Sequence, residues 1–246
     1  MSEIILNDRI VGGINDKSTR IVSEFYETFV EGSILETSAK TAEMCKLAEN
    51  SFRDVNIAFA NELSMICGNQ DIDVWELIEL ANRHPRVNIL KPGAGVGGHC
   101  IAVDPWFIVS ENQEQARIIK EARLVNDTKP EWVAEKIINK VNLLALDDNK
   151  IPTVACFGLA FKPDIDDFRE SPAIKIIDLL TESGINVIVV EPNIDEQDKY
   201  KLVSFDKALE ADIIALLVGH KEFYEPQRKS ELIELGALYF CGVLKH

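Results

Sequence analysis

The sequence has 246 residues, and at about 150 residues per domain this length predicts one or two domains. Hydrophobic residues make up 46% and charged residues 27% of the chain, which excludes a disordered or fibrous protein. The formal net charge is −15, and no basic patch is visible, so we expect no nucleic-acid partner and no anionic membrane surface. The first ten residues, MSEIILNDRI, predict no signal peptide, no apolar run reaches the roughly 18–20 residues of a membrane-spanning helix, and we therefore expect a cytoplasmic protein.

The five cysteines and four histidines show neither a CxxC pair nor the spacing of a zinc site. The sequence therefore predicts no metal site. It predicts reduced thiols, most of them buried as small hydrophobic side chains.

The first third of the chain is predicted to be mostly helical. Residues 4–6 and 9–11 are β-like and end at Gly12 and Gly13, and we interpret them as the last strand of a domain whose beginning the sequence lacks. The pattern is helical from residue 18, with a short connector at residues 31–35 and a long amphipathic helix over residues 38–67. Ser38 or Thr41 is its predicted N-cap. A helix of this length with a wide apolar face favours packing against another subunit, so we expect a homodimer through it.

A second helical stretch surrounds a glycine-rich loop. A helix is predicted over residues 73–82, capped by Asp71 or Asp73. Residues 84–105, HPRVNILKPGAGVGGHCIAVDP, are predicted to be a loop because glycine and proline set its backbone. Residues 105–140 read as helices again, with Asn126 and Asp127 as a cap before KPEWVAEKIINKV.

The pattern changes after a polar connector at residues 146–152. Strands are predicted over residues 153–157, 185–190, 213–218 and 237–240, with helices over 173–182, 208–211 and 229–235. Alternating strands and helices indicate a parallel sheet covered on both faces. The predicted fold class is α/β: an all-α central domain with a long helix, followed by a doubly wound, Rossmann-like C-terminal domain. Its ligand is expected at the carboxyl ends of the strands, near Gly158 and Glu191.

Gly93, Gly95 and Gly98 match the dinucleotide pattern G-x-G-x-x-G. That pattern binds a pyrophosphate only where it follows a strand and opens a helix. Here Lys91-Pro92 precedes the first glycine and no helix of useful length begins at Gly98. We therefore predict a tight loop whose glycines allow close backbone approach, and not a nicotinamide-binding turn.

Three polar groups near this loop could carry chemistry. Cys100 follows the glycines, next to His99 and four residues before Asp104, and it is either an accessible nucleophile or a buried loop cysteine. Lys46 and Asn50 stand four residues apart on the long helix, so both point from the same side. They are either part of a site or a solvated pair on the exposed face.

Three long blocks resemble the UDP-glucose/GDP-mannose dehydrogenase family: EMCKLAENSFRDVNIAFANEL at residues 43–63, NRHPRVNILKPGAGVGGHCIAVDPWF at 82–107 and CFGLAFKPDIDDFRESPA at 156–173. The first two are most similar to the branch that oxidises UDP-N-acetyl-D-mannosamine. The resemblance implies three parts: residues 1–17 as a remnant of an NAD-binding domain, residues 18–145 as the central dimerisation domain, and residues 151–246 as the UDP-sugar-binding domain.

The resemblance also implies a chemistry. The family oxidises C6 of a sugar nucleotide twice with NAD as cofactor, from alcohol to aldehyde to carboxylate. Cys100 matches the nucleophile that forms a thiohemiacetal and then a thioester. Lys46 matches the lysine that stabilises charge on the C6 oxygen, Asn50 its neighbour, and Asp104 the aspartate of the hydrolysis step.

The substrate and cofactor contacts follow from the same resemblance. Gly97 and Gly98 match the loop that wraps the sugar, and Arg86 matches an arginine that reaches the substrate across the dimer. Phe161 and Lys162 match a pair that meets the sugar nucleotide, and Arg169 matches an arginine that contacts NAD.

Some positions depart from the family pattern. Val103 replaces a lysine of glucose-specific relatives, and Cys241 stands where relatives usually carry an aspartate. The sequence also lacks the family's N-terminal NAD fingerprint. We therefore expect a UDP-N-acetylmannosamine 6-dehydrogenase part that is inactive without an NAD domain, which a separate chain could supply. The alternative is a non-catalytic, dimeric nucleotide-sugar-binding module.

Overall fold

The structure is a computed structural model that describes residues 2–148, 152–194 and 198–242. It contains two compact units, Met1–Phe52 and Arg53–His246, and the boundary between them falls inside the long helix α3 (Ala39–Gln70). No helix in the described ranges is both long enough and apolar enough to cross a membrane.

The first unit is a small βαβ fold. It contains α1 (Ser2–Leu6), β1 (Arg9–Gly13), α2 (Asp16–Tyr26) and β2 (Ile34–Ser38). The two strands pair in parallel, with Arg9 opposite Ile34 and Gly13 opposite Ser38, and α2 provides the crossover that a parallel pair needs.

Two sequence predictions fail in this unit. Residues 4–6 are helical and not β-like. They belong to α1, and the Arg9 side chain donates to the carbonyls of Glu3 and Ile4 in this helix, at 2.8 and 2.7 Å, which is a contact that hydrophobicity alone does not reveal. Strand β2 occupies part of the predicted connector and the predicted first helical residue. It forms through its pairing with β1, a distant contact that the local pattern does not show.

The helix N-caps were predicted better. The Ser38 hydroxyl accepts the Thr41 N–H at 3.2 Å, which confirms the first of the two predicted caps of α3. Asp73 caps α4 (Val74–Ala81) through the N–H of Trp75 at 2.9 Å, which confirms the second of the two predicted caps.

The predicted cap at Asn126 and Asp127 is wrong. After α5 (Asp104–Glu111), a single helix α6 runs over Arg117–Asp148, with both residues and Pro130 inside it. The Asn126 amide is buried and donates to Asp54 Oδ1 at 2.8 Å. Its partner lies on α3, distant in sequence, so the sequence pattern that resembles a cap marks a contact between two helices.

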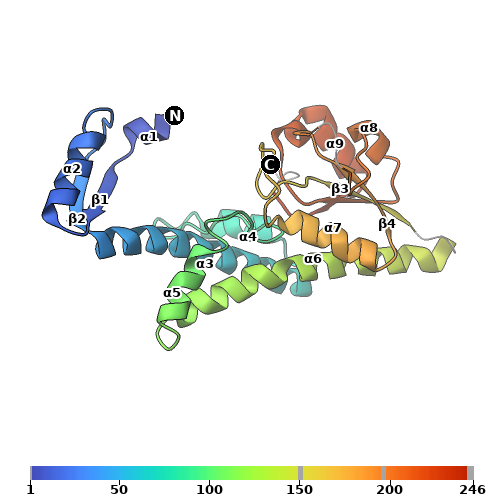
Figure 1. Ribbon diagram of the computed structural model, residues 1–246. Helices are drawn as coiled ribbons and strands as arrows, with labels where there is room; N and C mark the ends of the chain where they lie inside the picture. Colours follow the sequence, from blue (N-terminus) through green and yellow to red (C-terminus); the bar gives the residue numbers. More distant parts are fainter. Residues whose placement is uncertain (1, 149–151, 195–197, 243–246) are drawn as a thin grey trace. The chain divides into compact units, whose positions relative to one another are not determined.

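The rest of the second unit is a four-stranded parallel sheet in the order β4-β3-β5-β6. This confirms the α/β class and the doubly wound arrangement. Figure 1 shows α6 and α7 below the sheet and α8 and α9 above it. The elements are β3 (Thr153–Phe157), α7 (Pro172–Glu182), β4 (Asn186–Val190), α8 (Phe205–Ala208), β5 (Ile213–Leu216), the 3-10 helix η1 (Lys221–Tyr224), α9 (Pro226–Glu234) and β6 (Leu238–Tyr239).

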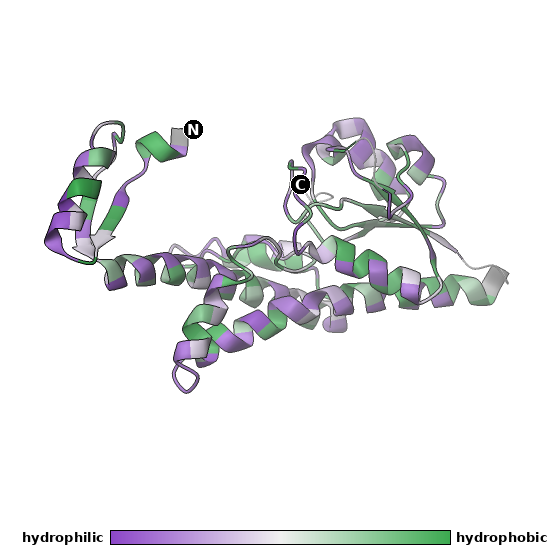
Figure 2. Ribbon diagram, in the orientation of Figure 1, coloured by the Kyte–Doolittle hydropathy of each residue, from purple (hydrophilic) through white to green (hydrophobic). Residues whose placement is uncertain are grey.

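The core of this sheet explains the unbroken apolar run of β3. Val154 and Cys156 face the cluster formed with α6 and α7, whereas Ala155 and Phe157 face the cluster formed with α8 and α9. Both faces are therefore buried, as expected of a parallel strand between two helical layers. Figure 2 shows hydrophobic residues along α7 and the strands that it covers.

Candidate functional site

The glycine-rich loop connects α4 with α5. No helix or strand forms over residues 82–103, all of which the structure describes, and α5 begins only at Asp104. The G-x-G-x-x-G match therefore does not open a helix, as predicted, and builds no pyrophosphate turn. The loop is anchored at Gly93, whose N–H donates to the buried Asn61 side chain of α3 at 2.9 Å.

The other end of the loop packs against the segment that follows β3. A Cβ atom added to Gly97 would lie 2.4 Å from the Glu170 carbonyl oxygen, and one added to Gly98 would lie 2.8 Å from the Phe161 ring. Gly98 has φ +82° and its N–H donates to the Arg169 carbonyl at 3.1 Å. Glycine is needed at both positions because no side chain fits there.

This contact brings Cys100 close to Arg169. The Cys100 side chain is exposed, and the Cys100 carbonyl accepts the N–H of Asp104 at 2.8 Å. Hydrogen bonds and the charge of Asp167, and to a lesser degree the charge of Cys100, raise the pKa of Arg169. By contrast, burial raises the pKa of the Cys156 thiol to about 12, so that thiol stays protonated and inert.

Asp167 has no predicted role, but it binds a candidate site residue. Arg169 binds it through two nitrogens, with Nε to Oδ1 at 2.9 Å and Nη2 to Oδ2 at 2.6 Å. These bonds hold the pKa of Asp167 at about 2, and His99 adds to the effect. Nothing in the spacing of Asp167 and Arg169 indicated that the pair would lie beside Cys100.

Lys46 and Asn50 belong to the first unit and point from the same side of α3, as predicted. Lys46 Nζ donates to Asn50 Oδ1 at 3.4 Å. The Lys46 side chain is 63% exposed, but Asn50 is only 3% exposed. The interpretation as a solvated pair therefore fits Lys46 and does not fit Asn50.

Phe161 and Lys162 line a cavity of about 300 Å³ at the carboxyl ends of β3 and β5, where the sequence predicted a ligand site. Lys91, Leu217 and Cys241 also contribute to its walls. The Lys162 ammonium lies 5.8 Å from the centre of the Phe161 ring. The cavity thus offers cations, an aromatic face and apolar walls, which suits a nucleotide.

Arg86 is exposed to solvent. Its backbone N–H donates to His84 Nδ1 at 3.3 Å. Within the described part of the chain, Arg86 forms no hydrogen bond or ion pair with Cys100 or with the Phe161 segment.

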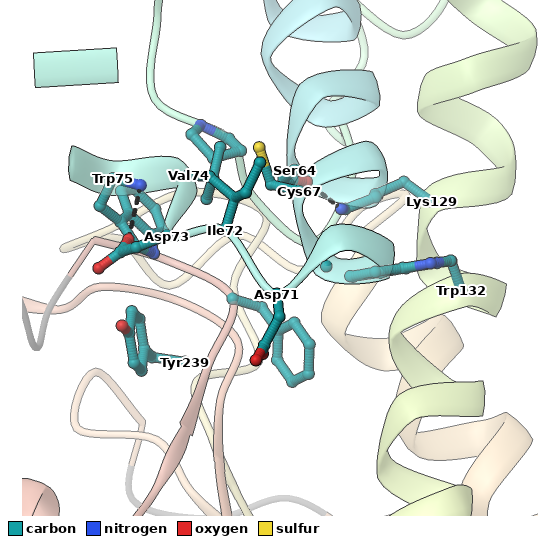
Figure 3. Close-up of a pocket in the computed structure, with 13 residues that line it drawn as sticks. Ser64, Cys67, Asp71, Ile72, Asp73, Val74, Trp75, Lys129, Trp132 and Tyr239 are labelled. Carbon is teal, nitrogen blue, oxygen red and sulfur yellow. Dashed lines mark hydrogen bonds between the residues drawn. The ribbon is translucent and has the colours of Figure 1, made fainter. Parts of the chain in front are cut away.

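A second cavity of about 380 Å³, lined by α3, α4, α6 and β6, contains a residue that the sequence analysis missed (Figure 3). Lys129 is only 2% exposed; its Nζ donates to the Ser64 hydroxyl at 2.5 Å and lies 4.0 Å from the centre of the Trp132 ring. Burial, with the charge of Lys136, lowers the pKa of Lys129 to about 7. On the sequence Lys129 resembles an ordinary helix-surface lysine.

The comparisons with known proteins agree with this arrangement. Residues 40–128 match the central domain of the UDP-glucose/GDP-mannose dehydrogenase family, and residues 155–238 match its UDP binding domain. The chain belongs to the UDP-glucose/GDP-mannose dehydrogenase family. The resemblance seen in the sequence is thereby confirmed.

Three relatives of the family illustrate the match. The UDP-N-acetyl-D-mannosamine dehydrogenase of Campylobacter jejuni is 58% identical over 92% of this chain and 56% of its own length. A UDP-D-ManNAc dehydrogenase from Pyrococcus horikoshii has a TM-score of 0.84 and 36% identity, covering 100% of this chain and 58% of its own. The Staphylococcus aureus UDP-N-acetyl-mannosamine dehydrogenase Cap5O has a TM-score of 0.80 and 42% identity, covering 91% and 52%. The chain thus spans about half the length of these family members.

Substitution of Gly97 tests the loop contact. Gly97→Ala places a methyl group 2.4 Å from a backbone oxygen, so we expect the free energy of unfolding to fall by about 1–3 kcal/mol. Gly93→Ala is the matched control, because its Cβ would meet only the Gly95 carbonyl oxygen at 3.8 Å. Urea unfolding followed by circular dichroism measures both variants, and equal stability losses would contradict the close approach at Gly97.

The Lys129 amine predicts a pH dependence of stability. Its pKa is about 7 in the folded chain, whereas the ordinary value for a lysine is 10.5, so between these values the unfolded chain binds a proton that the folded chain does not. Stability relative to Lys129→Met therefore rises with pH across this window. In urea unfolding we expect Lys129→Met to be more stable than the wild type at pH 7, with the difference shrinking by pH 10. Lys207→Met, on the surface, is the control; a pH-independent difference for Lys129→Met would contradict the lowered pKa.

Proposed function

We propose that this chain provides the cysteine-bearing and UDP-sugar-binding part of a UDP-N-acetyl-D-mannosamine 6-dehydrogenase. The observation that carries the proposal is the contact of Gly97 and Gly98 with Phe161, which puts the exposed Cys100 beside the part of the chain that matches the family's UDP binding domain. The names of the similar bacterial and archaeal proteins support the choice of sugar.

In this proposal Cys100 is the nucleophile. Loss of a hydride and a proton from the C6 alcohol first gives the aldehyde. The Cys100 thiolate attacks this aldehyde and, with a proton, forms a thiohemiacetal, which loses a second hydride and a proton to become a thioester. Water then releases the carboxylate and restores the thiol. Arg169 is the cation beside this cysteine, and the interaction of the two groups contributes to the raised pKa of Arg169.

The other residues stabilise charge and move protons. The Lys46 ammonium, with Asn50 beside it, stabilises the negative charge that develops on the C6 oxygen. Asp104 accepts a proton during hydrolysis of the thioester. Backbone at Gly97 and Gly98 approaches the sugar, Arg86 contacts the substrate of a second copy, and Phe161 and Lys162 bind the nucleotide.

NAD would accept the two hydrides. Among the described residues we propose only one contact with NAD, the exposed Arg169 side chain. The glycine motif opens no helix, so it offers no site for the pyrophosphate of NAD. We therefore assign to this chain the binding of the sugar and the covalent step.

The absence of a helix after the glycine motif also favours a second candidate function. A dimeric nucleotide-sugar-binding module without catalysis needs the cavity beside Phe161 and Lys162 but no pyrophosphate turn. An activity assay separates the two functions.

A homodimer is supported by an apolar groove in the second unit. The groove, of about 810 Å³, runs between α3 and the first part of α6, and Phe59 and Ile118 are exposed on it. An exposed apolar surface of this kind is typical of a protein interface. The partner that we propose is a second copy of this chain.

Production of NADH from UDP-N-acetyl-D-mannosamine tests the function. We expect no turnover by the purified chain alone, and turnover when the NAD-binding fragment of a similar dehydrogenase is added. Cys100→Ser should remove turnover while leaving UDP binding intact, because the thiol acts only in the covalent steps. Binding of UDP without turnover in the mixture would favour the non-catalytic module, and turnover by the chain alone would contradict the need for an added fragment.

Light scattering at micromolar concentration tests the dimer. Phe59 is 54% exposed in the groove, and Phe59→Glu should convert dimer to monomer because a charge would be buried without a partner. Leu235→Glu is the control, since Leu235 is 53% exposed at the end of α9. A wild-type monomer, or dissociation by both variants alike, would contradict the interface.

A further inference from the structure

Two buried side chains surround the turn that carries Phe161 and Lys162. Glu191 directly follows β4 and His220 lies shortly after β5, the two strands that flank β3 in the sheet. Both side chains are buried. They therefore lie at the carboxyl ends of the strands, directly beneath the turn that leaves β3.

Glu191 holds the residues just before the Phe161–Lys162 pair. Its Oε2 accepts the N–H groups of Leu159 at 2.7 Å and of Ala160 at 3.2 Å. Burial alone would raise the pKa of Glu191, but hydrogen bonds from His220 and the backbone hold it at about 2. The group is thus a carboxylate at neutral pH, and its bonds to backbone N–H groups are of the strong, charge-assisted kind.

His220 holds Asp164, which lies two residues after the pair. Its Nδ1 accepts the Asp164 N–H at 3.0 Å, while its Nε2 lies 3.1 Å from Glu191 Oε2 and donates to it. Asp164 has φ +60°, in the left-handed region that is unfavourable for most residues other than glycine. Its carboxylate also accepts the Lys221 N–H at 2.9 Å, so both its backbone and its side chain are fixed.

We propose that Glu191 and His220 are positioning residues that hold Phe161 and Lys162 in the geometry in which they bind the uridine diphosphate group of the nucleotide sugar. The proposal rests on the proposed function, which places the nucleotide at this pair. Glu191 and His220, which we call the clamp, fix the backbone on both sides of the pair, and the side chains of Phe161 and Lys162 line the cavity. A turn that is ordered before binding does not lose conformational entropy when the ligand arrives.

A matched set of variants separates the two bonds of His220. His220→Asn keeps an oxygen near the position of Nδ1, so it retains an acceptor for Asp164. His220→Gln keeps a donor near the position of Nε2, so it retains the contact with Glu191 but loses the acceptor. Glu191→Gln removes the charge that accepts the N–H groups of Leu159 and Ala160.

The experiment measures UDP affinity by calorimetry and amide hydrogen exchange by NMR, both on the full chain. We expect Glu191→Gln and His220→Gln each to weaken UDP binding about tenfold. Exchange should accelerate at Leu159 and Ala160 in the first variant and at Asp164 in the second. His220→Asn should restore protection at Asp164 and bind UDP more tightly than His220→Gln does.

Asp178→Asn is the control for general destabilisation. It weakens the bond from Tyr200 Oη to Asp178, 2.9 Å long, in the same domain, and it should leave UDP affinity unchanged. UDP binding of wild-type strength by both Glu191→Gln and His220→Gln would overturn the proposal, as would unchanged exchange at all three amides. A wild-type chain that binds no UDP contradicts the proposed function instead, and the amide exchange then still decides whether the clamp exists.

Discussion

The candidate site depends on one steric constraint, the approach of the glycine loop to the segment after β3. Gly97 and Gly98 lie so close to Glu170 and Phe161 that not even a methyl group fits between them. Cys100 follows Gly98 by two residues, so the position of the thiol is set by this contact. A bulkier loop would move the thiol away from Arg169 and from the cavity at the strand ends, and the chemistry and the binding surface would separate.

The other end of the loop is fixed by buried polar groups. Gly93 binds Asn61, Asn61 binds Asn126, and Asn126 binds Asp54, which also pairs with Arg123 at 2.6 Å. Burial raises the pKa of Asp54 in spite of the guanidinium, and no described residue donates to Asp54 Oδ2. Apolar side chains at these positions could stabilise the fold equally well. The series of polar hydrogen bonds instead fixes the position of the loop against α3, which an apolar contact would specify less well.

The sequence predicted features that depend on neighbouring residues and missed those that depend on distant ones. The strand at Thr153–Phe157 and the cap at Asp73 were correct, because burial on both faces and capping leave a local pattern. Asn126 was misread because its partner lies on another helix, and β2 because its partner strand is distant. The roles of His220 depend on three segments that meet only in the folded sheet, so no spacing in the sequence reveals them.

The charge distribution also connects the fold with the proposed ligand. A chain with a net charge of −15 repels a nucleotide diphosphate at long range, but salt screens that repulsion beyond about 8 Å. Close to the cavity the balance is local: Lys91 and Lys162 line it, while the Glu191 carboxylate beneath the turn is stabilised by hydrogen bonds from backbone N–H groups and His220. The Glu191 carboxylate therefore binds backbone N–H groups of the turn. The ammonium groups of Lys91 and Lys162, which line the cavity, can then interact with the diphosphate of the proposed ligand.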